Sequence, residues 1–249
     1  MPLLVVVALS ALAIVVLGLV WREADTGSPP DGEPPVLAGR QLWGSCAAGF
    51  YARRDTTIVL TSSAHCAAEG TTAWDPSGRV VRGVFGPPAV LDPCEHAATH
   101  TCRPSDINYL VVAEDQIPWG RLNVVAFGDG GERVLTADTV PLACDDIGVG
   151  DAVEINGRDM FRAGTLAEKG EYLHAGDGDY FPCMIAAGDV QVGVGDSGGA
   201  VMVRGEPAGV TSRSFGGLLG FTPLAEGLAA LDLVLCTTPN CGLAPPGPP

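Results

Sequence analysis

Basic residues are scarce in this 249-residue chain. Lysine and arginine together number 14, against 29 aspartates and glutamates, and the formal net charge at pH 7 is −15. A protein that binds DNA or RNA needs a basic surface that displaces counterions from phosphate. The composition therefore argues against a nucleic-acid partner. The acidity itself indicates solubility and a mild preference for cationic partners.

Aromatic and charged residues are also few, at 6% and 17% of the chain. Hydrophobic residues make up 47%, so the chain can bury a sizeable core, and disorder of the whole chain is excluded. The 34 glycines and 20 prolines favour many turns and short elements over long helices.

No cysteine stands in a CxxC pair. The eight cysteines are scattered, and an even, scattered set is typical of disulfides formed in an oxidising compartment. Their spacing alone leaves the connectivity open. The cysteines are Cys46, Cys66, Cys94, Cys102, Cys144, Cys183, Cys236 and Cys241.

The N-terminal segment is apolar. Leu3 to Val20 contains no charged residue and would span roughly 27 Å as a helix, close to the hydrocarbon core of a bilayer. Residues 1–22 are therefore expected to form a transmembrane anchor or a signal peptide. The segment has no basic n-region and no small-x-small cleavage site, which favours the anchor, while a cleaved signal stays open. Both alternatives place the rest of the chain outside the cytoplasm, either membrane-anchored or secreted.

Proline-rich segments flank the remaining chain. Residues 23–37 carry prolines among Gly, Ser and Asp, and such a composition predicts an extended linker. Residues 237–249 form a second proline-rich segment, the tail of the chain, and we expect the part after Cys241 to be disordered. The folded domain is thus expected over residues 38–236.

Short apolar runs rich in Val, Ile and Thr, separated by Gly, Pro and Asp, fill the middle of the chain. This pattern is typical of an all-β sandwich or barrel. The Leu224–Leu233 stretch instead has helical spacing and predicts a short C-terminal helix. The runs are Thr57–Thr61, Arg79–Val84, Tyr109–Ala113, Asn123–Phe127, Ala152–Ile155, Gly199–Val203 and Ala208–Thr211.

Three segments carry residues suited to acyl transfer. His65 follows an apolar run, Asp106 precedes another, and Ser197 lies in Gly-Asp-Ser-Gly-Gly. A serine hydroxyl needs a histidine base, and a buried carboxylate fixes the tautomer of that histidine. Glycines beside the serine let backbone N–H groups point at a developing oxyanion. The order His, Asp, Ser is more specific than any one of these motifs.

With these three segments in this order, the chain resembles the trypsin-like serine peptidases of chymotrypsin fold, in particular the bacterial streptogrisin and α-lytic branch. The resemblance runs from about Leu37 to Leu235. It implies an all-β fold with two six-stranded antiparallel β-barrels, a short C-terminal helix, and an active site between the barrels. It also implies a serine endopeptidase with His65, Asp106 and Ser197 as its catalytic residues. The expected partner is a protein or peptide substrate, and we expect a monomer that needs no cofactor or metal.

The resemblance assigns further roles. The N–H groups of Gly195 and Ser197 would form the oxyanion hole, and Asp196 would be the buried acid that supports their loop. Because no trypsin-type activation site precedes the domain, an internal cation is expected at Asp196, and Arg158 is our candidate. The family's disulfide beside the histidine implies the pair Cys46–Cys66.

Four residues are assigned to substrate binding by the same resemblance: Gln191, Ser212, Arg213 and Ser214. Gln191 stands at the position where trypsin has an acidic residue at the base of its specificity pocket. A preference for Lys or Arg in the substrate is therefore not supported. Ser212 would also support the triad aspartate. We expect Ser214 to narrow the pocket and to favour small apolar side chains.

Alternative interpretations remain. The Cys94-x-His96-x3-His100-x-Cys102 motif has ligands suited to zinc, but a disulfide closing a small loop is favoured in an exported protein. His174 precedes an acidic glycine-rich stretch, which we interpret as a surface loop and not as a calcium site. If Cys236 forms a local disulfide with Cys241, Cys144 and Cys183 remain to form a disulfide with each other. A catalytically inactive extracellular binding module on the same scaffold, and an esterase, stay open as functions.

Overall fold

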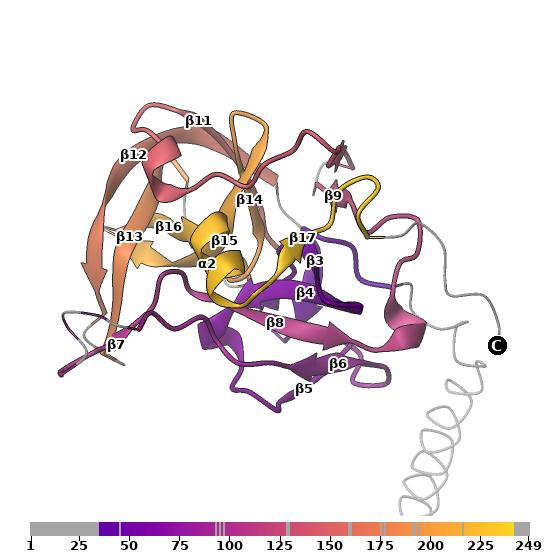
Figure 1. Ribbon diagram of the computed structural model, residues 1–249. Helices are drawn as coiled ribbons and strands as arrows, with labels where there is room; N and C mark the ends of the chain where they lie inside the picture. The colour runs from indigo at the N-terminus through magenta and orange to yellow at the C-terminus, as the bar shows by residue number, and fades with distance from the viewer. Residues whose placement is uncertain are drawn as a thin grey trace, which may run out of the picture. The chain divides into compact units, whose positions relative to one another are not determined.

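The computed structural model describes residues 35–241, except positions 45, 93, 95, 97, 128–129, 159–160, 175, 177, 191–192, 194 and 216. All the expected apolar runs lie in strands or overlap them. The elements form two main sheets, two small two-stranded sheets and one short α-helix (Figure 1). Within the described residues no helix is long and apolar enough to cross a membrane. The Leu3–Val20 segment lies outside those residues.

The first main sheet positions His65 and Asp106, which lie just outside the ends of two of its strands. In the central strand β4 every residue after Thr57 is buried, so both faces of the strand are covered. A strand covered on both faces has a nearly continuous apolar sequence instead of an alternating one, and β4 fits this pattern. The last strand in the chain, β17, completes one edge of this sheet. The order is β17 (Val234–Leu235), β3 (Tyr51–Arg54), β4 (Thr57–Ser63), β8 (Ile107–Val112), β6 (Val81–Phe85) and β5 (Thr72–Trp74).

The second main sheet closes on itself because β12 pairs with both β11 and β13. It has seven strands instead of the expected six, because the short strand β7 from the first half of the chain adds in parallel to β13. The order is β12 (Phe161–Leu173), β11 (Ala152–Asn156), β14 (Ala200–Val203), β15 (Glu206–Phe215), β16 (Leu218–Pro223), β13 (Asp179–Gly188) and β7 (Thr101–Cys102).

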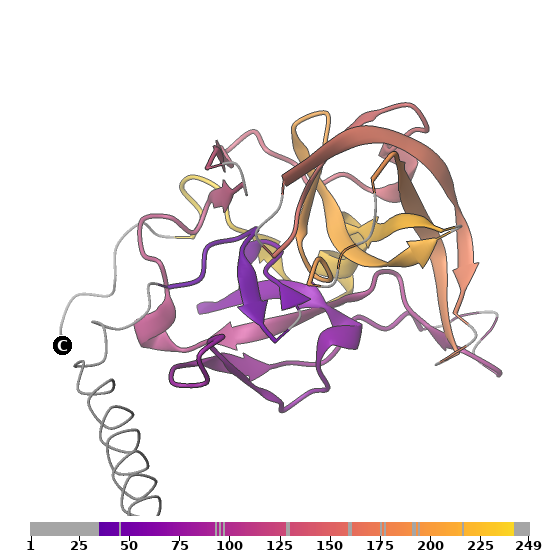
Figure 2. The same cartoon turned by 180° about the vertical axis from the view of Figure 1, so that it is seen from behind.

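The long β12–β13 hairpin curves around one end of the second sheet (Figure 2). At its tip Asp179 pairs with Thr101 and Tyr180 with Cys102, so the hairpin reaches the loop just before Asp106. The hairpin thereby connects the sheet that holds the serine to the segment that holds the aspartate.

Short elements complete the fold. The two small sheets pair β1 (Gln41–Trp43) with β2 (Cys46–Ala47) and β9 (Val124–Ala126) with β10 (Glu132–Val134). Single turns of 3₁₀-helix lie at η1 (Ala64–Cys66), η2 (Glu114–Gln116) and η3 (Cys144–Asp146).

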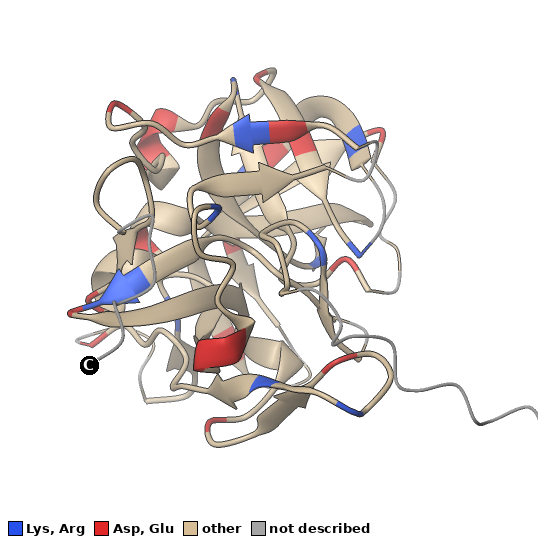
Figure 3. Ribbon diagram, turned by 90° about the vertical axis from the view of Figure 1, so that its right-hand side faces the viewer, with Lys and Arg blue, Asp and Glu red and all other residues tan. Residues whose placement is uncertain are grey.

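Acidic and basic positions are interspersed along the ribbon in Figure 3 and do not gather in one block there.

Helix α2 (Leu224–Ala230) follows β16 and contacts β15 and β17. The expected helix extended to Leu233, but the chain leaves helical geometry at Leu231, and Asp232 has a φ of 54°. A residue of positive φ ends a helix because the next backbone unit turns away from its axis. Gly227 lets α2 approach closely, since a Cβ there would lie 2.5 Å from Ile107 Cδ1. The helix therefore packs against the residue next to Asp106.

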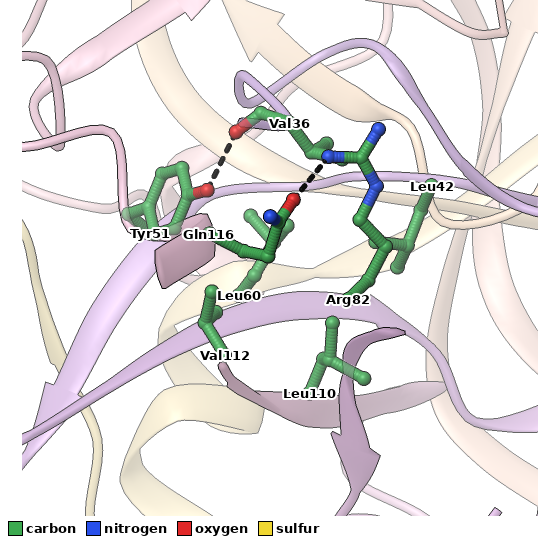
Figure 4. A pocket seen from close by; sticks show the side chains of 8 residues that line it. All are labelled: Val36, Leu42, Tyr51, Leu60, Arg82, Leu110, Val112 and Gln116. Atoms are coloured by element: carbon green, nitrogen blue, oxygen red, sulfur yellow. Dashed lines mark hydrogen bonds between the residues drawn. The ribbon is translucent and has the colours of Figure 1, made fainter. Parts of the chain in front are cut away.

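The interior of the first sheet is filled by side chains (Figure 4). The Tyr51 hydroxyl donates to the Val36 carbonyl at 2.5 Å, and Arg82 Nη1 donates to Gln116 Oε1 at 2.5 Å. Burial raises the pKa of Tyr51 far above its ordinary value, although the nearby Arg82 charge acts in the opposite direction. Val36 is thus part of this core.

Four disulfides join the described cysteines: Cys46–Cys66, Cys94–Cys102, Cys144–Cys183 and Cys236–Cys241. Cys46–Cys66 is the pair that the resemblance implied, and Cys94–Cys102 is the loop-closing disulfide that was favoured over a zinc site. The Cys94–Cys102 bond removes both thiolates from the zinc motif, and the described residues hold no group of three or more His, Cys, Asp or Glu placed to bind a metal.

Candidate active site

His65 and Asp106 are in direct contact. His65 lies on η1, immediately after β4, and Asp106 immediately precedes β8, the strand that pairs with β4. The two side chains meet with His65 Nδ1 2.6 Å from Asp106 Oδ2, and the His65 backbone N–H donates to Oδ1 at 3.3 Å. The Asp106 side chain is fully buried, whereas the imidazole is 26% exposed. The histidine is therefore oriented by an inner carboxylate while part of its ring stays accessible.

Asp106 receives support from the second sheet. The Ser212 hydroxyl, on β15, donates to Asp106 Oδ2 at 2.5 Å, and Arg213 Nε lies 3.9 Å from the same oxygen. Burial alone would raise the pKa of Asp106. The hydrogen bond and charge of His65, the Ser212 hydroxyl and the Arg213 charge outweigh it and hold this pKa below its ordinary value. The carboxylate is thus stabilised as an anion.

Thr222 positions the backbone around Asp106. The Asp106 N–H donates to Thr222 Oγ1 at 3.0 Å, and the Ser105 hydroxyl donates to the same oxygen at 3.0 Å. Thr222 is fully buried on β16. The sequence analysis missed this role, because only the fold brings residues 105 and 222 together.

Ser197 lies on a loop that is hydrogen-bonded to β2 and to β15. Its carbonyl accepts the Ala47 N–H at 2.7 Å and lies 3.8 Å from Cys66 Sγ, one residue after His65. On the other side, the Gly198 N–H donates to the Thr211 carbonyl at 2.8 Å. The nucleophile loop is therefore held beside the histidine segment by one strand from each half of the chain.

Glycine is required next to the serine. Gly198 has a φ of 87°, and a Cβ there would overlap the Ser62 hydroxyl. A side chain at this position would therefore push the nucleophile loop away from β4. Gly195 has a φ of 101°. Among the described residues, the N–H groups of Gly195 and Ser197 have no acceptor. No described group of the protein therefore occupies these two N–H groups, which are the expected donors of the oxyanion hole.

Asp196 forms an ion pair with Arg162. The carboxylate side chain is 4% exposed, and its Oδ2 also accepts the Gly193 N–H at 2.7 Å. An internal cation at Asp196 was expected from the sequence, but the residue there is Arg162 and not Arg158. Arg158 instead lies against Gly195, where a Cβ would be 2.8 Å from its Cδ. Arg162 lies on β12 and its guanidinium reaches the loop that carries Ser197, since a Cβ on Gly193 would lie 2.9 Å from Arg162 Nη2.

The four residues expected to bind substrate differ in burial and in what they contact. Gln191 lies outside the described residues. Ser212 is buried against Asp106, Arg213 is largely buried and Ser214 is exposed. Only Ser212 and Arg213 therefore contact the aspartate.

Arg213 belongs to a charged cluster that the sequence did not predict. Its Nη1 donates to His174 Nδ1 at 2.8 Å, and its Nη2 lies 3.5 Å from Asp179 Oδ2. Arg103 Nε approaches Asp179 Oδ1 at 2.8 Å, an ion pair without the alignment of a hydrogen bond. His174, expected in a plain surface loop, is thus connected to the residue that faces Asp106.

Comparison with known proteins gives a structural match only. No protein-family model matches this sequence, and no curated protein is recognisably similar to it. Protease A of Thermobifida fusca has a TM-score of 0.59 at 20% identity, covering 82% of this chain and 99% of that one. Cellulomonas bogoriensis chymotrypsin has a TM-score of 0.58 at 20% identity, covering 82% and 100%. Nocardiopsis protease has a TM-score of 0.58 at 19% identity, covering 81% and 99%.

The chain has the chymotrypsin fold in its bacterial form. The match extends over the whole length of these proteases, so neither of the two main sheets is missing. At about one-fifth identity, however, this similarity establishes the fold and leaves the chemistry to be argued from the residues at positions 65, 106 and 197.

Proposed function

We propose that this chain is a serine endopeptidase that hydrolyses peptide bonds through an acyl-enzyme on Ser197. The observation that carries the proposal is the 2.6 Å contact between His65 Nδ1 and the fully buried Asp106 carboxylate. A histidine held in this way presents its other ring nitrogen as a base, and the carbonyl of Ser197 lies 3.8 Å from Sγ of Cys66, the residue after that histidine.

The acylation step uses three groups of the chain. Ser197 Oγ attacks the carbonyl carbon of the scissile bond while its proton passes to His65 Nε2. Asp106 stabilises the imidazolium that forms. The N–H groups of Gly195 and Ser197 stabilise the oxyanion, and each such donor contributes about 10²–10³ in rate.

Collapse of the tetrahedral intermediate completes the reaction. The C–N bond breaks, and the leaving amine takes the proton from His65. A water molecule then attacks the acyl-enzyme with His65 again as the base, and the carboxylic acid product leaves with Ser197 regenerated. The buried Arg162–Asp196 pair supports the loop through both steps.

Substrate preference is part of the proposal. The resemblance assigns to Gln191 the position where trypsin has an acid, which supports no selection for Lys or Arg, and it assigns the exposed Ser214 to the pocket entrance, where a small residue favours small apolar side chains. Cleavage of Ala-, Leu- and Arg-terminated chromogenic peptides tests this preference. A clear advantage for Arg contradicts it.

Export is proposed on two grounds. The four disulfides are typical of an oxidising compartment outside the cytoplasm. Residues 1–22 supply the anchor or signal, and residues 23–37 link it to the peptidase domain. Cell fractionation with N-terminal sequencing tests this proposal. An intact N-terminus in the membrane fraction supports the anchor, a truncated N-terminus supports the signal, and a cytoplasmic location contradicts both.

The function is tested by hydrolysis of an internally quenched peptide mixture by purified protein. We expect turnover by the wild type and none by Ser197→Ala, with both proteins showing the same disulfides and circular dichroism. A folded wild type that cleaves no peptide contradicts the proposal and favours an inactive binding module. Turnover of esters without turnover of peptides identifies an esterase.

A further inference from the structure

Two tryptophans and an arginine border an open pocket of about 610 Å³ next to the nucleophile loop. Trp43 comes from β1, Trp74 comes from the adjacent β5, and Arg158 follows β11. No residue that we assign to catalysis lines this pocket. The rest of its wall is formed mainly by the residues of the turn that begins at Asp75.

The apolar part of the pocket is ordered and accessible. Trp74 is 42% exposed. Trp43 is half-buried and packs edge-on against the buried Phe85, with 6.0 Å between the ring centroids. One indole is therefore anchored in the core of the first sheet while the other presents a face to solvent, a combination suited to holding a flat apolar group.

Among the described residues that line the pocket, Asp75 is the only acid, and its carboxylate is occupied by its own turn. The carboxylate of Asp75 accepts the N–H groups of Arg79 and Val80, each at 2.6 Å, and it also contacts Ser77. Although burial acts in the opposite direction, these bonds hold the pKa of Asp75 far below its ordinary value. Because its oxygens are engaged in the turn, the recognition surface is supplied by the indoles.

Two of the residues that line the pocket are connected to the expected active site. At one end, a Cβ on Gly195, the expected oxyanion donor, would lie 2.8 Å from Arg158 Cδ. At the other end, Gly44 stands two residues before Cys46, and the disulfide partner of that cysteine is Cys66, the neighbour of His65. Arg158, which lines the pocket, therefore lies against the loop that carries Ser197. Gly44, which also lines it, is joined to the neighbour of His65 through the Cys46–Cys66 disulfide.

These two connections fix which half of a substrate reaches the pocket. The acyl half is expected along β15, the strand of Ser212 and Ser214, which belongs to the second sheet. An extended peptide crossing Ser197 must carry its leaving half away from β15, toward β1 and β5. We propose that the pocket between Trp43 and Trp74 binds a large apolar, preferably aromatic, side chain within the first three residues after the scissile bond. This inference rests on the proposed peptidase function.

The test compares peptides that differ only after the scissile bond. Full-length wild type, Trp74→Ala and Val84→Ala are assayed with quenched peptides that carry Ala or Phe at each of the three positions. Val84 is the matched control, because it is 43% exposed on the neighbouring strand and lies outside the pocket. An ester of the same acyl group with a small alcohol has no residues after the bond, so its hydrolysis reports the catalytic residues alone.

We expect the wild type to prefer Phe over Ala about tenfold in kcat/KM at one of the three positions. The preference should fall to within about twofold in Trp74→Ala and persist in Val84→Ala. Active enzyme without any such preference, or a preference that survives Trp74→Ala, overturns the inference.

Loss of the proposed function gives a different result, because the ester is then not hydrolysed either. In that case, binding of amidated Ala-Phe-Ala and Ala-Ala-Ala tripeptides to the wild type is measured by calorimetry. Failure of the phenylalanine peptide to bind more tightly overturns the inference independently of catalysis.

Discussion

Ser212 and Asp106, 106 residues apart in the chain, share a hydrogen bond of 2.5 Å from the serine hydroxyl to the carboxylate. One residue belongs to the second sheet and the other to the segment that leads into the first. The bond therefore joins the two halves of the fold at the oxygen that also contacts His65. It makes Ser212 a positioning residue, which acts on the histidine through the aspartate.

Removing this hydroxyl should weaken catalysis without unfolding the protein. We expect Ser212→Ala to lower kcat/KM about 10- to 100-fold, because a hydrogen bond to a buried carboxylate contributes about 1.5–3 kcal/mol. The pKa of Asp106 should also rise, since its carboxylate loses one bond that favours the anion. Thr56→Ala removes an exposed hydroxyl from the β3–β4 turn and should change neither quantity. Equal behaviour of the two variants contradicts the positioning role.

The Asp106 carboxylate should make the protein sensitive to acid. Its pKa in the folded state is held below the ordinary value of 3.8, mainly by His65 and Ser212 acting against burial. Such a group contributes stability that is fully present above the unfolded-state pKa and is lost as the pH falls through the folded-state pKa.

Thermal unfolding from about pH 5 down to about pH 2 measures this contribution. Wild type should lose more stability than Asp106→Asn over that range, because the asparagine cannot be protonated. Asp106→Asn should also lower kcat strongly while the fold is retained. Parallel stability curves for the two proteins would show that the aspartate is not stabilised as an anion.

Breaking the Arg162–Asp196 pair should be costly. Asp196 is 4% exposed and Arg162 18% exposed, so Arg162→Gln leaves a buried carboxylate without its ion partner. We expect a loss of about 3–5 kcal/mol in unfolding free energy and a large loss of activity. Arg204→Gln, which breaks the more exposed pair with Asp151, should cost at most about 1 kcal/mol. Denaturant titrations that give the same loss for both variants contradict the supporting role of Arg162.

The disulfides should differ in their contribution to stability. Cys144–Cys183 closes a loop of 39 residues and Cys236–Cys241 one of 5. Loop-closure entropy gives about 4 kcal/mol for the first bond and about 2 kcal/mol for the second. Replacement of each pair by alanines, followed by denaturant unfolding, should show this order. The reverse order would mean that contacts around the bonds outweigh the entropy of the unfolded chain.

The sequence predicted what depends on local pattern. The runs at Thr57–Thr61 and Tyr109–Ala113 are strands because their β-branched and apolar residues suit buried sheet positions. The motifs pointed to His65, Asp106 and Ser197; the structure places the first two side chains in contact, and it places the Ser197 carbonyl 3.8 Å from Sγ of Cys66, the residue after His65. The β12 strand was missed because its Ala, Glu, Lys and Leu residues favour a helix and most of them are exposed. Pairing with β11 and β13 overrides that preference.

The support around the site could not be read from the sequence. Thr222 and Arg162 contact Asp106 and Asp196 only after distant strands have packed. Arg158 was the candidate from the sequence, but the structure places Arg162, on β12, at the carboxylate. The connection of His174 through Arg213 to the aspartate likewise depends on the hairpin tip, for which no sequence motif exists.

The central claim is that Ser197 is activated by His65, and a fluorophosphonate probe tests it most directly, because only an activated serine reacts at an appreciable rate. With intact disulfides, the wild type should acquire one adduct, located by mass spectrometry on the peptide that contains Ser197. Labelling should be absent in Ser197→Ala and at least about 10³-fold slower in His65→Ala. A folded wild type that takes up no label, or a label that persists in Ser197→Ala, contradicts the account.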